Sequence, residues 1–173
     1  MRNALRTGPA NGNIGPAMRI SVLNRQKCLR LQPDFLRKLS AFFASLPGLS
    51  GRLPPSLAIV LVDHRGMIRL QANARDEQDA TDVLCFPYRR VPGEPPDEAT
   101  ADIIINVERA AAVAARSGTG AIREIALYLA HALDHLGGGR DSSPAGRRLM
   151  RSRELRWLRK ACRAGLLQDR DRR

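Results

Sequence analysis

Two of the three histidines in this 173-residue chain, His131 and His135, lie four positions apart in a segment that favours a helix. Side chains four apart on a helix share a face, so both imidazoles can bind one metal ion. Three glycines follow one residue after His135 and let the chain turn back toward that ion. Asp141 lies beyond them, where the returning loop can supply a third ligand. Two imidazoles and one carboxylate leave an open coordination position, which is typical of a catalytic metal site.

The histidine pair has a simpler alternative, since H-x-x-x-H is common by chance and often marks surface histidines or histidines bonded to carbonyls. In a helical projection of 121–136 both histidines lie opposite the predicted core face, which comprises Ile122, Ile125, Ala126, Leu129, Leu133 and Leu136. Zinc proteases of the HExxH kind need a glutamate where this chain has Ala132, so that mechanism lacks its base. We expect Asp134 to be an ordinary exposed helix acid; orienting His131 or replacing a ligand are the alternatives.

The segments around the pair predict an α+β fold: a single domain with a small mixed β-sheet of about four strands, packed with about five helices. The metal site would lie at the end of a central helix. Apolar runs predict strands at 18–24, 57–63, 81–88 and 101–107, and periodicity with helix-start and helix-stop signals predicts helices at 33–43, 108–118, 121–136 and 144–165. We expect Gly66 to turn the chain, so that residues 67–73 form an antiparallel partner of the second strand.

The ends of the chain differ in composition from its middle. Residues 1–17 are rich in Gly, Pro and Asn and predict a flexible tail, 18–165 form the domain, and 166–173 form a charged C-terminal tail. No apolar run has the length of a membrane helix, and the first residues lack the apolar core of a signal peptide. Three widely spaced cysteines suit a reducing compartment, so we expect a cytoplasmic protein without a membrane partner.

The net charge of +12 comes almost entirely from arginine, because Lys27, Lys38 and Lys160 are the only lysines. Guanidinium groups match the geometry of phosphate, so nucleic acid is the leading class of partner. A GC-rich genome also raises arginine content without any binding role, and the charge alone does not separate these explanations. The aromatic content of 4% favours contacts with the nucleic-acid backbone over stacking on bases.

Four segments in register carry a resemblance to a known family. Leu70-Gln71-Ala72-Asn73-Ala74-Arg75 is similar to the motif L-N-x-x-Y/F-R, and Thr81-Asp82-Val83-Leu84-Cys85-Phe86-Pro87 to T-D/N-V-L-S-F-P. Ala101-Asp102-Ile103 is similar to G-D-I, and the segment HALDHLGGGRD to H-G-x-L-H-L-x-G-Y-D-H. Together, over roughly residues 18–158, these segments resemble the YbeY family of bacterial rRNA maturation factors, which are metal-dependent single-strand endoribonucleases.

The last segment departs from the family pattern at several positions. The family's third metal histidine falls on Asp141, the leucine before its second histidine on Asp134, and its Tyr-Asp pair on Gly139-Arg140. Carboxylate can replace imidazole as a zinc ligand, and the flexible Gly137–Gly139 run can offset its shorter arm. The alternative is a degraded site in a protein that only binds RNA or the ribosome.

The resemblance implies one divalent metal ion per chain, expected to be zinc, with His131, His135 and Asp141 as its ligands. Arg75 matches the family's arginine, which implies a catalytic role near the scissile phosphate. Cys85 replaces the family's serine; we expect a small buried residue there, with a metal ligand as the alternative.

The expected function is metal-dependent, single-strand-specific cleavage of RNA in maturation of the 16S rRNA 3′ end and in ribosome quality control. Single-stranded rRNA and the small ribosomal subunit would be the partners. Arg140, Arg148, Arg151 and Arg159 are predicted to bind the RNA backbone beside the metal, although a solvated basic helix face is the alternative. A metallohydrolase with another substrate is a third hypothesis, and the basic surface argues against a peptidase.

Overall fold

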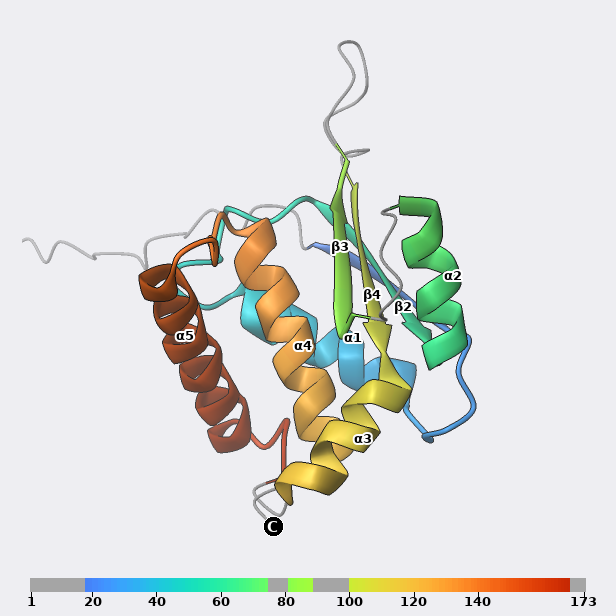
Figure 1. The fold of residues 1–173 in the computed structure, drawn as a ribbon. Helices are drawn as coiled ribbons and strands as arrows, with labels where there is room; N and C mark the ends of the chain where they lie inside the picture. Colours follow the sequence, from blue (N-terminus) through green and yellow to red (C-terminus); the bar gives the residue numbers. More distant parts are fainter. Residues whose placement is uncertain (1–17, 75–80, 89–99, 169–173) are drawn as a thin grey trace, which may run out of the picture.

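The computed structural model describes residues 18–74, 81–88 and 100–168. Along the chain the elements are β1 (Arg19–Asn24), α1 (Pro33–Ala44), β2 (Ser56–Val62), α2 (His64–Ala74), β3 (Val83–Pro87), β4 (Thr100–Asn106), α3 (Val107–Ser117), α4 (Ala121–Leu136) and α5 (Pro144–Arg163). The predicted α+β class, with a four-stranded mixed sheet and five helices, is confirmed. Figure 1 shows α4 between α5 and the sheet, which makes it the central helix.

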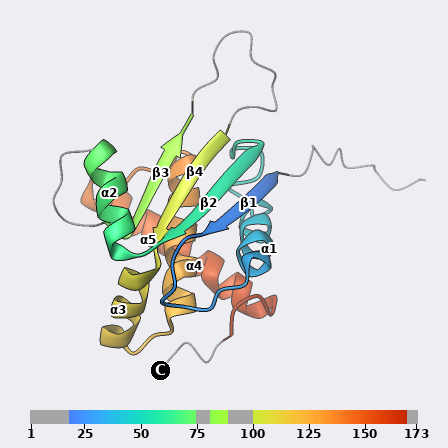
Figure 2. The same cartoon turned by 90° about the vertical axis from the view of Figure 1, so that its right-hand side faces the viewer.

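The sheet has the strand order β1-β2-β4-β3. β1, β2 and β4 run parallel, and β3 pairs antiparallel with β4 at one edge. The two central strands are rich in β-branched residues, which suits strands covered on both faces. Figure 2 shows the four strands side by side with α4 and α5 behind them. β3 is thus an edge strand, and its residues line the same cavity as His131 and His135 of α4.

α4 is buried on most of its circumference. The predicted core face packs into the main core, and so do Leu127, Tyr128, Ala130 and Ala132, which the projection placed outside that face. The helix contacts α1, α3, α5, β3 and β4, so no broad side of it is left for solvent. His131 and His135 remain partly exposed at its C-terminal end. A helix fixed on all sides gives these two side chains a rigid base.

The prediction of a hairpin strand at 67–73 is wrong, because this segment belongs to α2. Asp63 stands just before the helix, and its Oδ1 accepts a hydrogen bond from the backbone N–H of Gly66 at 2.6 Å. Met67 and Gln71, four residues apart, are both buried, which follows a helical period. Gly66, predicted to turn the chain, lies instead in the first turn of the helix.

Other boundaries agree closely with the sequence. α3 ends where Gly118 adopts a left-handed φ of 65°, which agrees with the predicted end of this helix at Gly118. Leu167 is buried in the core, so packing extends beyond the predicted boundary at 165. The predicted tail at 1–17 and the proline-rich segment at 89–99 lie outside the described residues. Within the described part of the chain, no helix combines the length and the apolar character needed to cross a membrane.

Candidate metal centre

Three ligand groups meet just beyond the end of α4. The Nε2 atoms of His131 and His135 lie 3.1 Å apart, and Asp141 Oδ2 lies 3.5 Å from His135 Nε2. The three ligand atoms all lie within 4.8 Å of one another. Four ligands at about 2.0–2.1 Å around a tetrahedral zinc ion are separated by roughly 3.3 Å, which is close to these distances. The structure thus brings together His131, His135 and Asp141, the three residues predicted from the sequence to bind a metal ion.

The other ring nitrogen of each histidine faces an acceptor. His131 Nδ1 lies 2.7 Å from Oε1 of Glu154, and His135 Nδ1 lies 3.2 Å from the carbonyl oxygen of Gly139. Both Nδ1 atoms therefore donate, and the Nε2 lone pairs converge on the same space. Two lone pairs at this distance repel unless a metal ion or a shared proton lies between them. Metal-bound histidines are oriented in this way by a carboxylate or a carbonyl, so the donor set fits a divalent ion.

Glu154 is a site residue that the sequence reasoning missed. Its side chain is 4% exposed, and it is the only acidic residue of α5. The hydrogen bond from His131 is the main reason why the pKa of this histidine is raised above its usual value. A lone acid in a helix otherwise rich in arginine was an available signal, because such an acid needs a specific buried partner.

Glycines in the returning loop permit close approach. A Cβ atom at Gly137 would lie 2.6 Å from Cδ2 of Leu49, and one at Gly139 would lie 2.6 Å from Oδ1 of Asp134. Gly138 alone needs its left-handed φ of 95°. We expected these glycines to supply flexibility; the packing shows instead that they let the loop lie directly against the end of α4.

Asp134 is buried, and the prediction of an exposed helix acid is wrong. Its carboxylate accepts two hydrogen bonds from Arg153, from Nε at 3.0 Å and from Nη2 at 2.9 Å. Both carboxylate oxygens of Asp134 are thus paired with Arg153 of α5, and Asp134 does not belong to the group of three ligand atoms. The bidentate ion pair with Arg153 therefore argues against the alternative in which Asp134 replaces a metal ligand.

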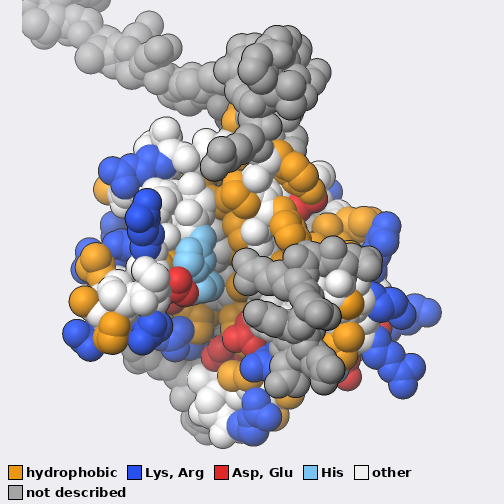
Figure 3. All heavy atoms as spheres, turned by 45° about the horizontal axis from the view of Figure 1, so that its top comes forward, with side chains coloured by type: hydrophobic (Ala, Val, Ile, Leu, Met, Phe, Trp, Pro, Cys, Tyr) orange, Lys and Arg blue, Asp and Glu red, His pale blue; other side chains and the backbone are white. Residues whose placement is uncertain are grey.

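A cavity of about 520 Å³ opens beside the ligands. His131, His135 and Asp141 line one side, and the opposite side is the edge strand β3 with the residues just before it. Cys85 lies in this wall, where burial raises the pKa of its thiol to about 11. Cys85 is half-buried and does not belong to the group of three ligand atoms, so the geometry favours the expected small, partly buried residue over the alternative of a metal ligand. In Figure 3 the histidines reach the surface between basic side chains on one side and hydrophobic ones on the other.

The four arginines predicted to bind RNA are all exposed. Arg148, Arg151 and Arg159 line an open depression along α5, together with Arg147, Ser152 and Leu155. Arg140 lies outside that lining, in the loop between α4 and α5. Arg151 is also linked to the metal centre, since its Nη1 lies 3.9 Å from Oε2 of Glu154.

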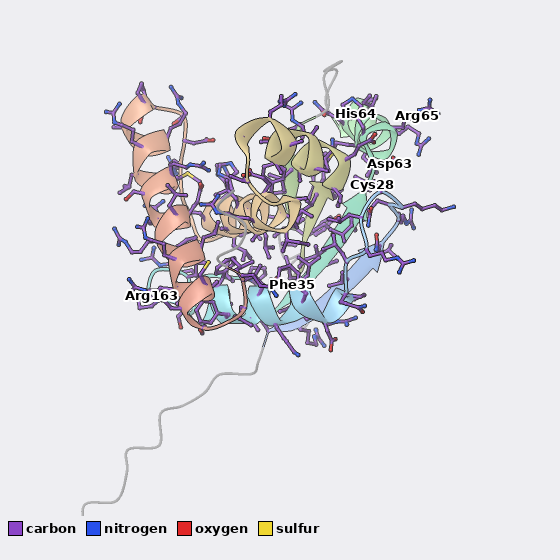
Figure 4. All side chains as sticks on the ribbon, turned by 90° about the horizontal axis from the view of Figure 1, so that it is seen from below. Cys28, Phe35, Asp63, His64, Arg65 and Arg163 are labelled. Carbon is purple, nitrogen blue, oxygen red and sulfur yellow. The ribbon has the colours of Figure 1, made fainter. Side chains whose placement is uncertain are left out.

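The structure does not place Arg75 or the third histidine in the site. Arg75 lies outside the described residues, so its catalytic role stays a prediction. The third histidine, His64, lies with Asp63 and Arg65 at the start of α2, well away from α5 (Figure 4). His64 is therefore separate from the metal centre.

Comparison with known proteins agrees with this arrangement. Residues 23–161 match the sequence profile described as Endoribonuclease YbeY. Over 118 residues the chain is 35% identical to Endoribonuclease YbeY of Anaeromyxobacter dehalogenans, covering 68% of this chain and 60% of that protein. Over 130 residues it is 36% identical to Endoribonuclease YbeY of Myxococcus xanthus, covering 72% of this chain and 43% of that protein. The chain thus spans less than two thirds of the length of these relatives.

The fold has a solved counterpart. The solution structure of TM1509 from Thermotoga maritima superposes with a TM-score of 0.58, covering 83% of this chain and 89% of that one at 18% sequence identity. At this sequence identity the match supports a shared fold and nothing about function. The profile match, in contrast, extends over most of the chain and includes the ligands, Glu154 and the edge strand. The chain therefore belongs to the Endoribonuclease YbeY family.

Proposed function

We propose that this protein is a metal-dependent endoribonuclease that cleaves single-stranded RNA. The observation that carries the proposal is the convergence of His131, His135 and Asp141 beside an open cavity. Two histidines oriented through Nδ1 and one carboxylate form a three-ligand set with room for a further ligand, as in catalytic sites. Zinc is the proposed ion, because it accepts this mixture of nitrogen and oxygen ligands.

Each residue of the site has a distinct task in RNA cleavage. A bound divalent ion supplies a Lewis acid for the phosphate and lowers the pKa of a water molecule. Glu154 holds His131 in the tautomer that leaves Nε2 free, and the Gly139 carbonyl does the same for His135. Arg75 is proposed to grip the scissile phosphate and to offset the negative charge that develops on it.

The substrate is proposed to lie along the cavity and continue onto α5. Arg148, Arg151 and Arg159 would grip successive phosphates, with Arg140 near the metal loop. The low aromatic content supports recognition of the backbone over recognition of bases. Since the relatives are bacterial endoribonucleases, we propose a role in 16S rRNA 3′-end maturation and ribosome quality control, on the small ribosomal subunit in the cytoplasm.

Metal content and RNA cleavage together test the proposal. The purified chain should carry about one zinc ion, measured by plasma mass spectrometry, and should cut a single-stranded RNA but not the corresponding duplex. His131→Ala and His135→Ala should lose both properties. His64→Ala is the matched control, because it removes a histidine outside the site, and it should keep both.

The alternative is a relative that binds RNA or the ribosome without cutting it, and the aspartate in place of the third histidine is what favours it. That protein would bind RNA in a salt-sensitive way, and binding would survive loss of both histidines. Retained binding with no zinc and no cleavage in the wild-type chain would contradict our proposal and select this alternative.

A further inference from the structure

The ion pair between Asp134 and Arg153 joins α4 to α5 at the base of the metal loop. It is bidentate, with hydrogen bonds of 2.9 and 3.0 Å, and the Asp134 side chain is only 6% exposed. An isolated carboxylate at this depth would be strongly unfavourable, because it loses water without gaining a partner. Arg153 therefore holds Asp134 in one orientation.

That orientation reaches the loop through Gly139. The backbone carbonyl of Asp134 accepts the N–H of Gly139 at 2.7 Å, and the carboxylate lies so close to Gly139 that a Cβ atom there would be 2.6 Å from Oδ1. The carbonyl of Gly139 in turn accepts from Nδ1 of His135 at 3.2 Å. A continuous chain of contacts thus leads from Arg153 to a metal ligand.

The same contacts help to place Asp141, which lies two residues after Gly139 and whose carbonyl also accepts from Nη1 of Arg147 at 3.0 Å. An aspartate has a shorter side chain than a histidine, so the loop has to come close to α4 if its carboxylate is to share an ion with two imidazoles. Two departures of this chain, an acid at Asp134 and a carboxylate at Asp141, are then related: the first holds the loop in the position that the second requires.

We infer that Asp134 and Arg153 are positioning residues that hold the loop at 137–141 against α4, so that Asp141 can act as the third ligand. The inference rests on the proposed metal site and names residues that do not touch the ion. Outer-shell partners of this kind typically change metal affinity about 10- to 100-fold when they are replaced.

The test uses zinc affinity measured by competition with a chromogenic chelator. Arg153→Leu should weaken zinc binding about 10- to 100-fold. Because Arg153→Leu leaves a buried carboxylate without its partner, the double variant Asp134→Leu/Arg153→Leu provides a form without that charge. The melting temperature of the metal-free double variant should be close to that of the metal-free wild type. Its zinc affinity should nevertheless be lower than that of the wild type. Arg156→Leu is the matched control, since it removes an exposed arginine of the same helix, and it should bind zinc like the wild type.

Two further measurements separate positioning from general support of the fold. In an Asp141→Ala background, Arg153→Leu should cause a clearly smaller loss of zinc affinity than in the wild type, because only the route through Gly139 and His135 remains. Asp141→Glu, with a longer arm, should restore at least part of the affinity that Arg153→Leu removes. The visible spectrum of the cobalt-substituted protein should change in Arg153→Leu and not in Arg156→Leu.

The outcomes distinguish this inference from the proposed function. A wild-type chain without zinc affinity would overturn both. Tight zinc binding by the wild type that is unchanged in both the Arg153→Leu and the double variant would overturn the positioning role alone. An equal loss in the Asp141→Ala background would also overturn it, because the effect would then not pass through Asp141.

Discussion

Replacing Glu154 by glutamine removes a single charge beneath the metal centre and keeps the shape of the side chain. The carboxylate is 4% exposed and lies 2.7 Å from His131 Nδ1, so the hydrogen bond is charge-assisted and shielded from water. The glutamine oxygen can still accept from His131, so the loss is the difference between a charged and a neutral acceptor, about 1–1.5 kcal/mol. At about 1.4 kcal/mol for each factor of ten, this loss corresponds to zinc binding weakened about 5- to 10-fold.

Zinc affinity by chelator competition and metal-free thermal unfolding are the two assays for Glu154→Gln. Glu124→Gln is the matched control, because Glu124 is also a buried acid, bonded to Thr119 at the other end of α4. We expect the control to keep its zinc affinity. If Glu154→Gln folds normally and binds zinc like the wild type, or if both variants lose affinity equally, the role assigned to the Glu154–His131 contact is refuted.

The same variant changes the pH dependence of stability in the metal-free protein. The hydrogen bond that His131 donates to Glu154 is the largest cause that raises the pKa of His131 above its usual 6.5. The pair therefore stabilises the folded state fully below that pH, and the contribution is lost as pH rises through the raised pKa of the folded protein. Unfolding of the chelator-treated protein, followed from pH ~5 to ~9, should show this decline in the wild type and a flatter profile in Glu154→Gln. Equal profiles would contradict the assignment.

Three smaller predictions concern other positions. Cys85, with a pKa of about 11, should be alkylated by iodoacetamide far more slowly at neutral pH than the exposed Cys28, and equal rates by mass spectrometry would contradict its burial. Gly139→Ala should lower the free energy of unfolding by about 1–3 kcal/mol in chemical denaturation, since the new Cβ meets Asp134; an unchanged value would mean that the loop can move away. Leu149→Ser, at 58% exposure, should change the free energy of unfolding by less than about 0.5 kcal/mol, and a larger loss would show that Leu149 packs in solution.

The sequence predicted α4, the strands and the proximity of His131, His135 and Asp141 because each depends on a local signal. Apolar runs of β-branched residues marked β2 and β4, and glycines marked the ends of α3 and α4. His131 and His135 were recognisable by their spacing, and Asp141 by its distance beyond the glycines. Such features are determined within a short stretch of chain, where periodicity and turn chemistry operate.

The errors came from interactions between distant segments. α2 was taken for a strand because its apolar residues also fit an alternating pattern, and packing of Met67 against Val62, Leu84 and Ile104 of the sheet decides for the helix. From the local sequence alone, Asp134 is typical of a surface residue. It is buried because it forms an ion pair with Arg153 on the next helix. Glu154 likewise acquires its role only when α5 packs on α4. No local pattern contains these partners.

Chain order gives the metal centre a place in the timing of synthesis. The strands that the structure describes all end by Asn106, and β4 pairs with β2 from Ser56 and Thr100 onward. The site residues come later in the chain: His131, His135, Asp141 and Glu154. A growing chain can therefore complete its sheet before any ligand has left the ribosome, and Glu154 emerges after all three ligands. A prematurely terminated chain would contain the sheet and lack the metal centre. Completion of translation thus limits when the site can first form.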